Sequence, residues 1–148
     1  MDRILLAVDG SEHSIRAATL AGELSFRFGA PVDVINVVPD GTPIVPGAVH
    51  EYAQLQRVSL TQRDLLESLG GEIVAVASHK VKEAGGDVGK LEVRLGTPPY
   101  SIVAFAEDAG SDCIVMGRRG MGDLKGLLMG SVSHRVGHLT DKTLITTE

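Results

Sequence analysis

The chain has 148 residues, the length of one compact domain, and its 43% hydrophobic content and mean hydropathy of +0.14 allow a sizeable core. The net charge of −5 and the 3% aromatic content argue against a nucleic-acid partner, which needs a phosphate-neutralising surface or a base-stacking platform. Cys113 is the single cysteine and cannot form an internal disulfide, so we interpret it as a core residue in a reducing compartment. No apolar run approaches the length of a membrane span, and Asp9 ends the first run before it could form a signal peptide. We expect a single cytoplasmic domain over residues 1–148, with neither nucleic acid nor membrane as a partner.

The first predicted elements are a strand over residues 4–8 and a helix that stops at Gly29. The strand is an unbroken aliphatic run, which is typical of a parallel strand buried on both faces. The helix carries apolar residues at helical spacing, namely Ala17, Leu20, Ala21, Leu24 and Phe28. Asp9 lies between the two elements and has two interpretations. It caps the helix, or its carboxylate faces a ligand at the carboxyl edge of the sheet.

The next segments are a second strand over residues 32–38 and a loop over 39–48 that is rich in proline and glycine. The loop is either a plain connector or a flank of a ligand site, since loops at the carboxyl ends of strands often carry function. Apolar residues at helical spacing predict a long crossover helix over residues 50–84. The pair Gly70-Gly71 predicts an interruption or a kink in it.

The second half of the chain continues the alternation of strands and helices. Residues 91–95 alternate as a third, more exposed strand. Thr97 is the expected N-cap of a helix with Pro98 at its first position, ending at Gly110. With a last strand over residues 143–147, this order predicts a parallel sheet covered by helices on both faces.

Between these elements, residues 111–133 contain a glycine-rich loop. The run 113–116 is short and β-branched, as expected for a buried strand, and Gly117 ends it. The spacing that follows, Gly117-x2-Gly120-x9-Gly130-Ser131, leaves no Cβ atom at three points where the backbone could approach an anion. A helix is expected from Ser131, with the N–H groups of its first turn facing the loop. The stretch therefore predicts a phosphate-binding loop.

Two commoner phosphate motifs do not fit this loop. A Walker A loop needs a lysine before its Ser/Thr, whereas Gly130 is followed directly by Ser131. A dinucleotide fingerprint needs a third glycine after the first strand, but the segment 120–125 lacks it and lies late in the chain.

The ordered motifs resemble the universal stress protein family, and in particular its ATP-binding branch. The resemblance rests on the glycine spacing, on Ile4-Leu5-Leu6-Ala7-Val8-Asp9-Gly10-Ser11, on Val34-Ile35-Asn36-Val37 and on Gly96-Thr97-Pro98. It implies a three-layer α/β/α fold, Rossmann-like and of the adenine nucleotide alpha hydrolase-like type. The implied sheet has five parallel strands in the order 3-2-1-4-5, which places the carboxyl ends of the first and fourth strands side by side.

The same resemblance implies an adenine-nucleotide site for ATP or AMP. Asp9 would lie near adenine and ribose, Val37 would contact adenine, and Mg²⁺ or Mn²⁺ on the phosphates would have Asp9 or water as ligands. Arg118, Arg119 and Lys125 add positive charge that is useful opposite polyphosphate but equally normal in a solvated loop. The expected nucleotide-binding residues are Val8, Asp9, Gly10, Ser11, Val37, Met116, Gly117, Arg119, Gly120, Gly130, Ser131, Val132 and Ser133.

Three functions remain open at this point. The leading one is a nucleotide-binding sensor or regulatory module of the stress response. The second is a slow Mg-dependent ATPase or an adenylating enzyme, although the sequence shows no general-base constellation and names no catalytic residue. The third is an interaction protein with a vestigial pocket.

Two features near the end of the chain complete the predictions. The last strand would be a sheet edge, and the resemblance implies a homodimer through residues 143–147, although Thr143 stands where the family often has proline. His134 and His138 are spaced i, i+4, but the sequence offers no third ligand, so it does not predict a metal site there.

Overall fold

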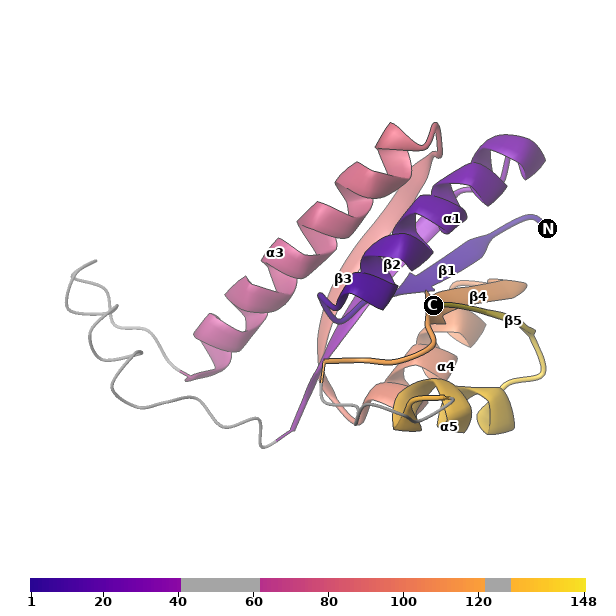
Figure 1. Ribbon diagram of the computed structural model, residues 1–148. Helices are drawn as coiled ribbons and strands as arrows, with labels where there is room; N and C mark the ends of the chain where they lie inside the picture. The colour runs from indigo at the N-terminus through magenta and orange to yellow at the C-terminus, as the bar shows by residue number, and fades with distance from the viewer. Residues whose placement is uncertain (41–61, 122–128) are drawn as a thin grey trace.

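The computed structural model describes residues 1–40, 62–121 and 129–148, and shows one sheet between two layers of helices (Figure 1). The five strands are β1 (Ile4–Ala7), β2 (Val32–Pro39), β3 (Val88–Gly96), β4 (Cys113–Gly117) and β5 (Thr143–Thr147). All of their pairings are parallel, in the order β3-β2-β1-β4-β5. The predicted fold class and strand order are confirmed. The loop predicted over 39–48, apart from its first two residues, the helix start predicted at 50–61 and Lys125 lie outside the described residues.

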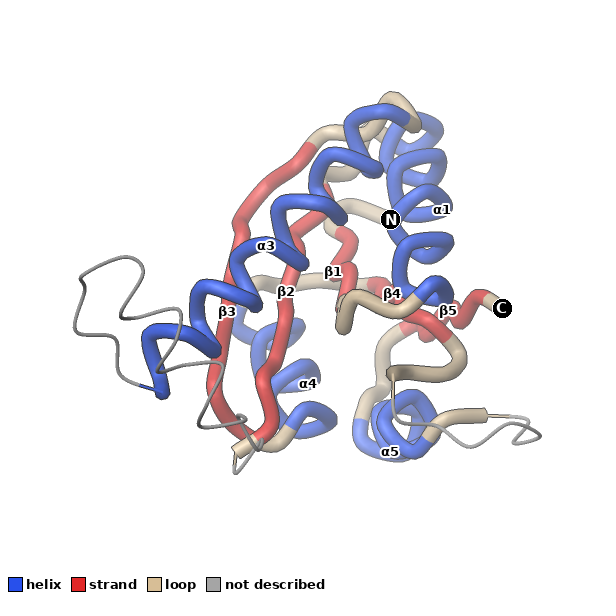
Figure 2. The backbone as a smooth tube through the Cα atoms, turned by 60° about the vertical axis from the view of Figure 1, so that its left-hand side comes forward, coloured by secondary structure: helices blue, strands red, loops and turns tan. Residues whose placement is uncertain are grey.

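The helices of the described segments are α1 (Glu12–Phe28), α3 (Gln62–Glu83), α4 (Pro98–Asp108) and α5 (Ser131–Leu139). α1 and α3 cover one face of the sheet, and α4 and α5 cover the other (Figures 1 and 2). Successive residues of a strand point to opposite faces, so Ile4 and Leu6 pack with α1 and α3 while Leu5 and Ala7 pack with α4. Because both faces are covered, the strand must be apolar throughout, as its sequence is.

Local chemistry explains where α1 and α4 begin and end. The Ser11 hydroxyl accepts a 3.2 Å hydrogen bond from the Ser14 N–H and caps α1, which ends at Gly29 with φ of 67°. Thr97 occupies the N-cap position of α4 with Pro98 in the first turn, as predicted, but its side chain makes no capping hydrogen bond.

The interruption that the sequence predicts at Gly70-Gly71 is not observed. α3 continues through Gly70 and Gly71 without interruption. A Cβ atom at Gly70 would lie 2.5 Å from Val93 Cγ1 and 2.8 Å from Asn36 Oδ1, so glycine there lets the helix approach the sheet closely. Phe28, the last of the apolar residues that predicted this helix, is 57% exposed, because it occupies the last helical position, beyond the face that packs on the sheet.

At the amino edge of the sheet, Asp33 forms a buried polar centre. Its carboxylate accepts hydrogen bonds from Arg3 Nη1, at 3.1 and 2.9 Å, and from the Lys90 N–H, at 2.7 Å. Asp33 is fully buried, so these bonds offset the cost of removing its charge from water. They fasten β1, β2 and β3 together at the edge opposite the glycine loop.

Cys113 lies in the core between β1 and β5, as expected. Burial raises the pKa of its thiol to about 11, so at neutral pH the sulfur stays protonated and is a poor nucleophile. In the described part of the chain, none of the helices is both long and apolar enough to span a bilayer.

Candidate functional site

A cavity of about 500 Å³ opens at the carboxyl ends of β1, β2 and β4. The register places Ala7 of β1 opposite Met116 of β4, so the segments that leave these two strands are neighbours although they are far apart in sequence. This is the sheet edge at which parallel α/β folds bind ligands. Its lining comprises Ala7, Val8, Asp9, Ser14, Ile35, Asn36, Val37, Val38, Pro39, Leu66, Leu69, Gly70, Ile73, Pro98, Ile102, Met116, Gly117, Arg118, Arg119, Gly120, Met121, Ser131, Val132 and Ser133.

The Asp9 carboxylate links the exit of β1 to the glycine loop. Its Oδ1 atom accepts a 2.9 Å hydrogen bond from the Ser11 N–H, and its Oδ2 atom accepts a 3.1 Å hydrogen bond from the Met121 N–H. Asp9 lines the cavity, whereas the capping of α1 falls to Ser11. Of the two interpretations of Asp9, the structure therefore favours the one that places it at the ligand edge.

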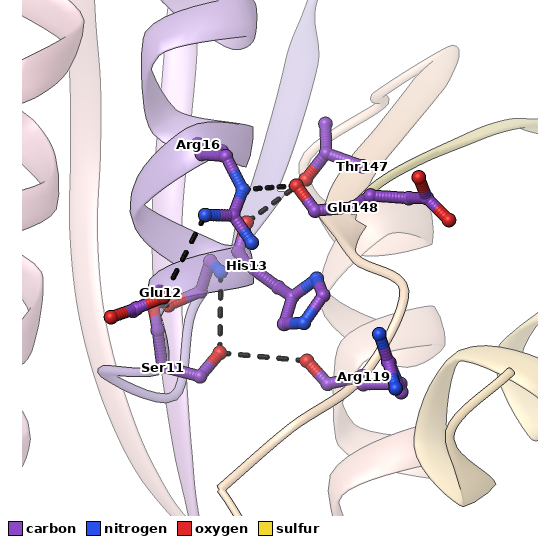
Figure 3. Close-up of polar contacts among 8 residues, drawn as sticks. Ser11, Glu12, His13, Arg16, Arg119, Thr147 and Glu148 are labelled. Carbon is purple, nitrogen blue, oxygen red and sulfur yellow. Dashed lines mark hydrogen bonds and ion pairs between the residues drawn. The ribbon is translucent and has the colours of Figure 1, made fainter. Parts of the chain in front are cut away.

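The first turn of α1 packs directly on the end of β4 (Figure 3). The Ser11 hydroxyl lies 3.5 Å from the Arg119 carbonyl, and a Cβ atom at Gly117 would lie 2.8 Å from His13 Cβ. Gly117 is therefore needed for close packing of α1 against β4. Gly10 has φ of 84°, the left-handed conformation that turns the chain from β1 into this helix.

Hydrogen bonds to one carbonyl close the ends of the glycine loop. The Arg118 carbonyl accepts from the Gly130 N–H at 2.8 Å and from the Ser133 hydroxyl at 2.6 Å. The Arg118 N–H in turn donates to the Thr147 carbonyl at 2.7 Å, and the Thr147 hydroxyl donates to the His13 carbonyl at 2.9 Å. The end of β5 is thereby tied to both the loop and α1, and Figure 3 shows the bond between Thr147 and His13.

α5 begins at the cavity with an unpaired first turn. Gly130 is the N-cap, so Ser131 is the first helical residue and does not cap the helix. In the described residues no acceptor receives the N–H groups of Ser131, Val132 and Ser133, and the first bonded amide is that of His134, which donates to the Gly130 carbonyl. These three donors and the positive end of the helix dipole form an anion-binding arrangement.

The two arginines after β4 differ in their partners. The Arg118 guanidinium pairs with the Glu148 carboxylate, so its charge is already partly neutralised. Both arginines line the cavity and each has a buried Nε atom without a hydrogen-bond partner among the described residues, but no ion pair to the Arg119 guanidinium is found there. Arg119 is therefore the better placed of the two to meet an anionic ligand.

Most of the predicted site residues lie together in the cavity wall. Ten of them line it, namely Val8, Asp9, Val37, Met116, Gly117, Arg119, Gly120, Ser131, Val132 and Ser133. Gly10, Ser11 and Gly130 are outside the lining and shape the turns beside it. For the predicted metal, Asp9 retains lone pairs after its two hydrogen bonds, but the described residues contain no group of three or more His, Cys, Asp or Glu side chains that could hold an ion.

Sequence reasoning missed the contribution of Asn36 and of α3. The Asn36 Nδ2 atom donates a 2.8 Å hydrogen bond to the Val8 carbonyl, and the side chain is 4% exposed. The sequence signal that could have indicated this role is the presence of an asparagine within an otherwise aliphatic strand. Leu66 and Ile73 of α3 form part of the apolar cavity wall, although no site residue was predicted in this helix.

A family model for the universal stress protein family matches residues 1–146, almost the whole chain. The chain belongs to the universal stress protein family. A curated member of this family, MJ0531 of Methanocaldococcus jannaschii, is 34% identical over 134 residues, covering 90% of this chain and 74% of that protein. YxiE of Bacillus subtilis is 27% identical over 139 residues, covering 94% of this chain and 93% of that one.

Solved structures of this family share the fold. The structure of MJ0577 from Methanocaldococcus jannaschii superposes with a TM-score of 0.75 at 25% identity, covering 99% of this chain and 94% of that chain. A universal stress protein in complex with cAMP gives 0.73 at 20% identity, covering 99% of this chain and 97% of the other. One from Archaeoglobus fulgidus in complex with dAMP gives 0.67 at 24% identity, covering 100% and 98%.

Proposed function

We propose that this protein binds an adenine nucleotide, ATP or AMP, in the cavity and acts as a sensor or regulatory module of the stress response. The observation that carries the proposal is the combination of an apolar cavity with three unpaired helix N–H groups at one end. In such a site the apolar part can hold a base, and the helix N–H groups can bind a phosphate group. The complexes of family members with cAMP and dAMP support the choice of adenine.

The base would lie in the apolar part of the cavity. Val37 and Met116 are almost fully buried in its wall, at 9% and 6% exposure, and Val8 lies beside them. A flat, weakly polar base such as adenine can cover these side chains with little loss of hydrogen bonds to water. Asp9 lies where the sugar would follow the base, with lone pairs left for ribose hydroxyls.

The phosphates would meet the first turn of α5. The N–H groups of Ser131, Val132 and Ser133 face no acceptor in the described chain, and Arg119 supplies a cation in the same wall. A Mg²⁺ or Mn²⁺ ion would be held mainly by phosphate oxygens and water, with Asp9 as the protein ligand.

A binding role explains the described site better than a hydrolytic one. Phosphoryl transfer needs a positioned base for the attacking water, and the described part of the cavity wall contains no histidine or glutamate, while both Asp9 oxygens accept hydrogen bonds from backbone amides. The proposal is therefore a nucleotide-responsive protein, with the cytoplasm as its compartment because its one cysteine is buried and reduced.

We also propose a homodimer through β5. β5 is an edge strand that pairs only with β4 in the described sheet, and its sequence TLITT carries no charge. The other edge, β3, carries Lys90, Glu92 and Arg94, and charged side chains discourage edge pairing. An antiparallel β5–β5 contact across a two-fold axis would satisfy the open backbone groups.

Mass spectrometry of small molecules released by denaturing the purified protein tests the proposed ligand. We expect ATP or AMP in amounts approaching one per chain after rapid purification without added nucleotide. Recovery of a different ligand at that stoichiometry, from protein that also fails to bind added ATP, would refute the assignment.

A further inference from the structure

We propose that His134 and His138 form a surface binding site for Zn²⁺. Both side chains are exposed on α5, and their Nε2 atoms lie 3.3 Å apart. The pair is outside the cavity lining, so this inference does not depend on nucleotide binding. Neutral imidazole nitrogen is a preferred zinc ligand, and an i, i+4 spacing brings two side chains to one face of a helix.

The separation of the two nitrogens fits zinc geometry. Two Zn–N bonds of about 2.05 Å ending on atoms 3.3 Å apart enclose an angle of about 107° at the metal. The tetrahedral angle is about 109°, so one ion can bridge both Nε2 atoms with almost no movement of the helix. A square-planar ion has a ligand–metal–ligand angle of about 90°. With bonds of about 2.0 Å, it would require the two Nε2 atoms to move from 3.3 Å to about 2.8 Å apart.

The surroundings of the pair fix its backbone and engage the neighbouring cation. Val136, between the two histidines in sequence, is fully buried and anchors α5, so the backbone that carries both rings is fixed. The neighbouring Arg135 is directed onto α4, where it donates a 3.1 Å hydrogen bond to the Tyr100 hydroxyl and stacks 5.9 Å over that ring. Its positive charge is therefore held at Tyr100, where a polar and an aromatic partner stabilise it.

The protons of the pair can accommodate the ion. The 3.3 Å contact is a hydrogen bond when one Nε2 carries a hydrogen, and in the tautomer with that hydrogen on Nδ1 both Nε2 lone pairs are available to a metal. The rings lie edge to face with centroids 4.6 Å apart, so both rings must also rotate to direct these lone pairs at one ion, and the net charge of the imidazoles does not change. Because the described residues offer no third side chain in such a cluster, water completes the coordination, and the site is an exchangeable one.

Calorimetric titration of the full-length protein with zinc chloride tests this proposal. We expect one Zn²⁺ per chain, and a loss of at least about tenfold in affinity in both His134→Gln and His138→Gln, because each variant leaves a single ligand. Glutamine is at least as good a helix former as histidine, so both variants should fold, which circular dichroism verifies. The matched control is His79→Gln, which removes another exposed i, i+4 pair, His79 Nε2 with Glu83 Oε1 at 3.1 Å, and should leave zinc binding unchanged.

Nitrogen NMR of the imidazoles provides the second measurement. Zinc should shift the Nε2 resonances of His134 and His138 together and leave that of His79 in place. Absence of zinc binding to the native chain, or binding that either variant retains or that His79→Gln abolishes, would overturn the proposal.

Discussion

The backbone N–H of Met121 donates a 3.1 Å hydrogen bond to Oδ2 of Asp9, across a sequence separation of 112 residues. The same carboxylate receives the Ser11 N–H on its other oxygen. Asp9 thus fixes the start of the glycine loop relative to the exit of β1, and both segments line the cavity. The shape of this part of the cavity therefore depends on the Asp9 carboxylate.

Replacing Asp9 with asparagine should release the loop and weaken ATP binding about tenfold, since a hydrogen bond to a charged group contributes about 1.5 kcal/mol or more. The asparagine Oδ1 can keep the Ser11 bond, but its NH₂ group then faces the Met121 N–H. Hydrogen exchange of the Met121 amide should accelerate in the variant. Asp108→Asn, which removes a carboxylate from the exposed side of α4, is the matched control and should change neither quantity. An unchanged exchange rate of the Met121 amide would contradict the proposal that the Asp9 carboxylate holds the loop in place.

Adenine nucleotides should bind in preference to GTP by at least about tenfold. The base-facing wall formed by Val8, Val37 and Met116 is apolar, so the additional polar edge of guanine would lose water without gaining partners, at a cost of about 1–3 kcal/mol. Displacement of a fluorescent ATP analogue by equal concentrations of ATP and GTP measures the difference. Equal displacement by the two would show that the wall does not select the base.

Replacing Ile145 with proline should shift the protein from dimer to monomer. Proline removes one N–H of β5 and obstructs strand pairing at the uncharged edge. Light scattering reports the oligomeric state, and circular dichroism shows whether the fold survives. A second variant, Thr146→Lys, leaves the backbone intact and places a charge on the edge, so it should also favour the monomer. A native chain that is monomeric at micromolar concentration would exclude the β5 dimer.

The buried Asp33 should contribute to the stability of the fold and should have no effect on ATP binding. Asp33→Asn removes a charge that pairs with Arg3 and turns an NH₂ group toward its guanidinium, so we expect a loss on the order of 3 kcal/mol in the free energy of unfolding. Urea denaturation measures this loss. ATP affinity should stay unchanged in the folded variant, because Asp33 lies at the amino edge of the sheet. A loss below about 1 kcal/mol would mean that the pair contributes little.

The fold could be predicted from the sequence because its signals are local. The aliphatic runs 4–8 and 113–116 mark buried parallel strands, and Gly29 marks the end of α1. The sheet order came from family resemblance, since nothing local in a strand states which neighbour it will have. The uninterrupted α3 departed from prediction because tertiary packing decides where glycine is tolerated within a helix.

The site was predictable as a set of residues but not as an arrangement. Glycine spacing located the loop, yet the reason for Gly117 is contact with His13, which only the packing of α1 on β4 reveals. The Asn36 side chain and the Asp9 bond to Met121 depend on distances between strands and loops that are remote in sequence. Side-chain to backbone contacts of this kind have no periodicity to detect.

Calorimetric titration with ATP of the native chain and of Gly130→Val tests the central claim most directly. Gly130 has φ of −72° and ψ of 159°, a conformation that valine also adopts without backbone strain. It lies outside the cavity lining but directly before the N–H groups of Ser131, Val132 and Ser133, so we expect the branched valine side chain to obstruct a phosphate that approaches them. Gly71→Ala is the matched control, because a Cβ atom there meets no atom within 4 Å. The account predicts one ATP per native chain, a loss of at least about tenfold in affinity for Gly130→Val with a nearly unchanged thermal melt, and no change for Gly71→Ala. Native affinity in a folded Gly130→Val protein, or no ATP binding by the native chain, would contradict it.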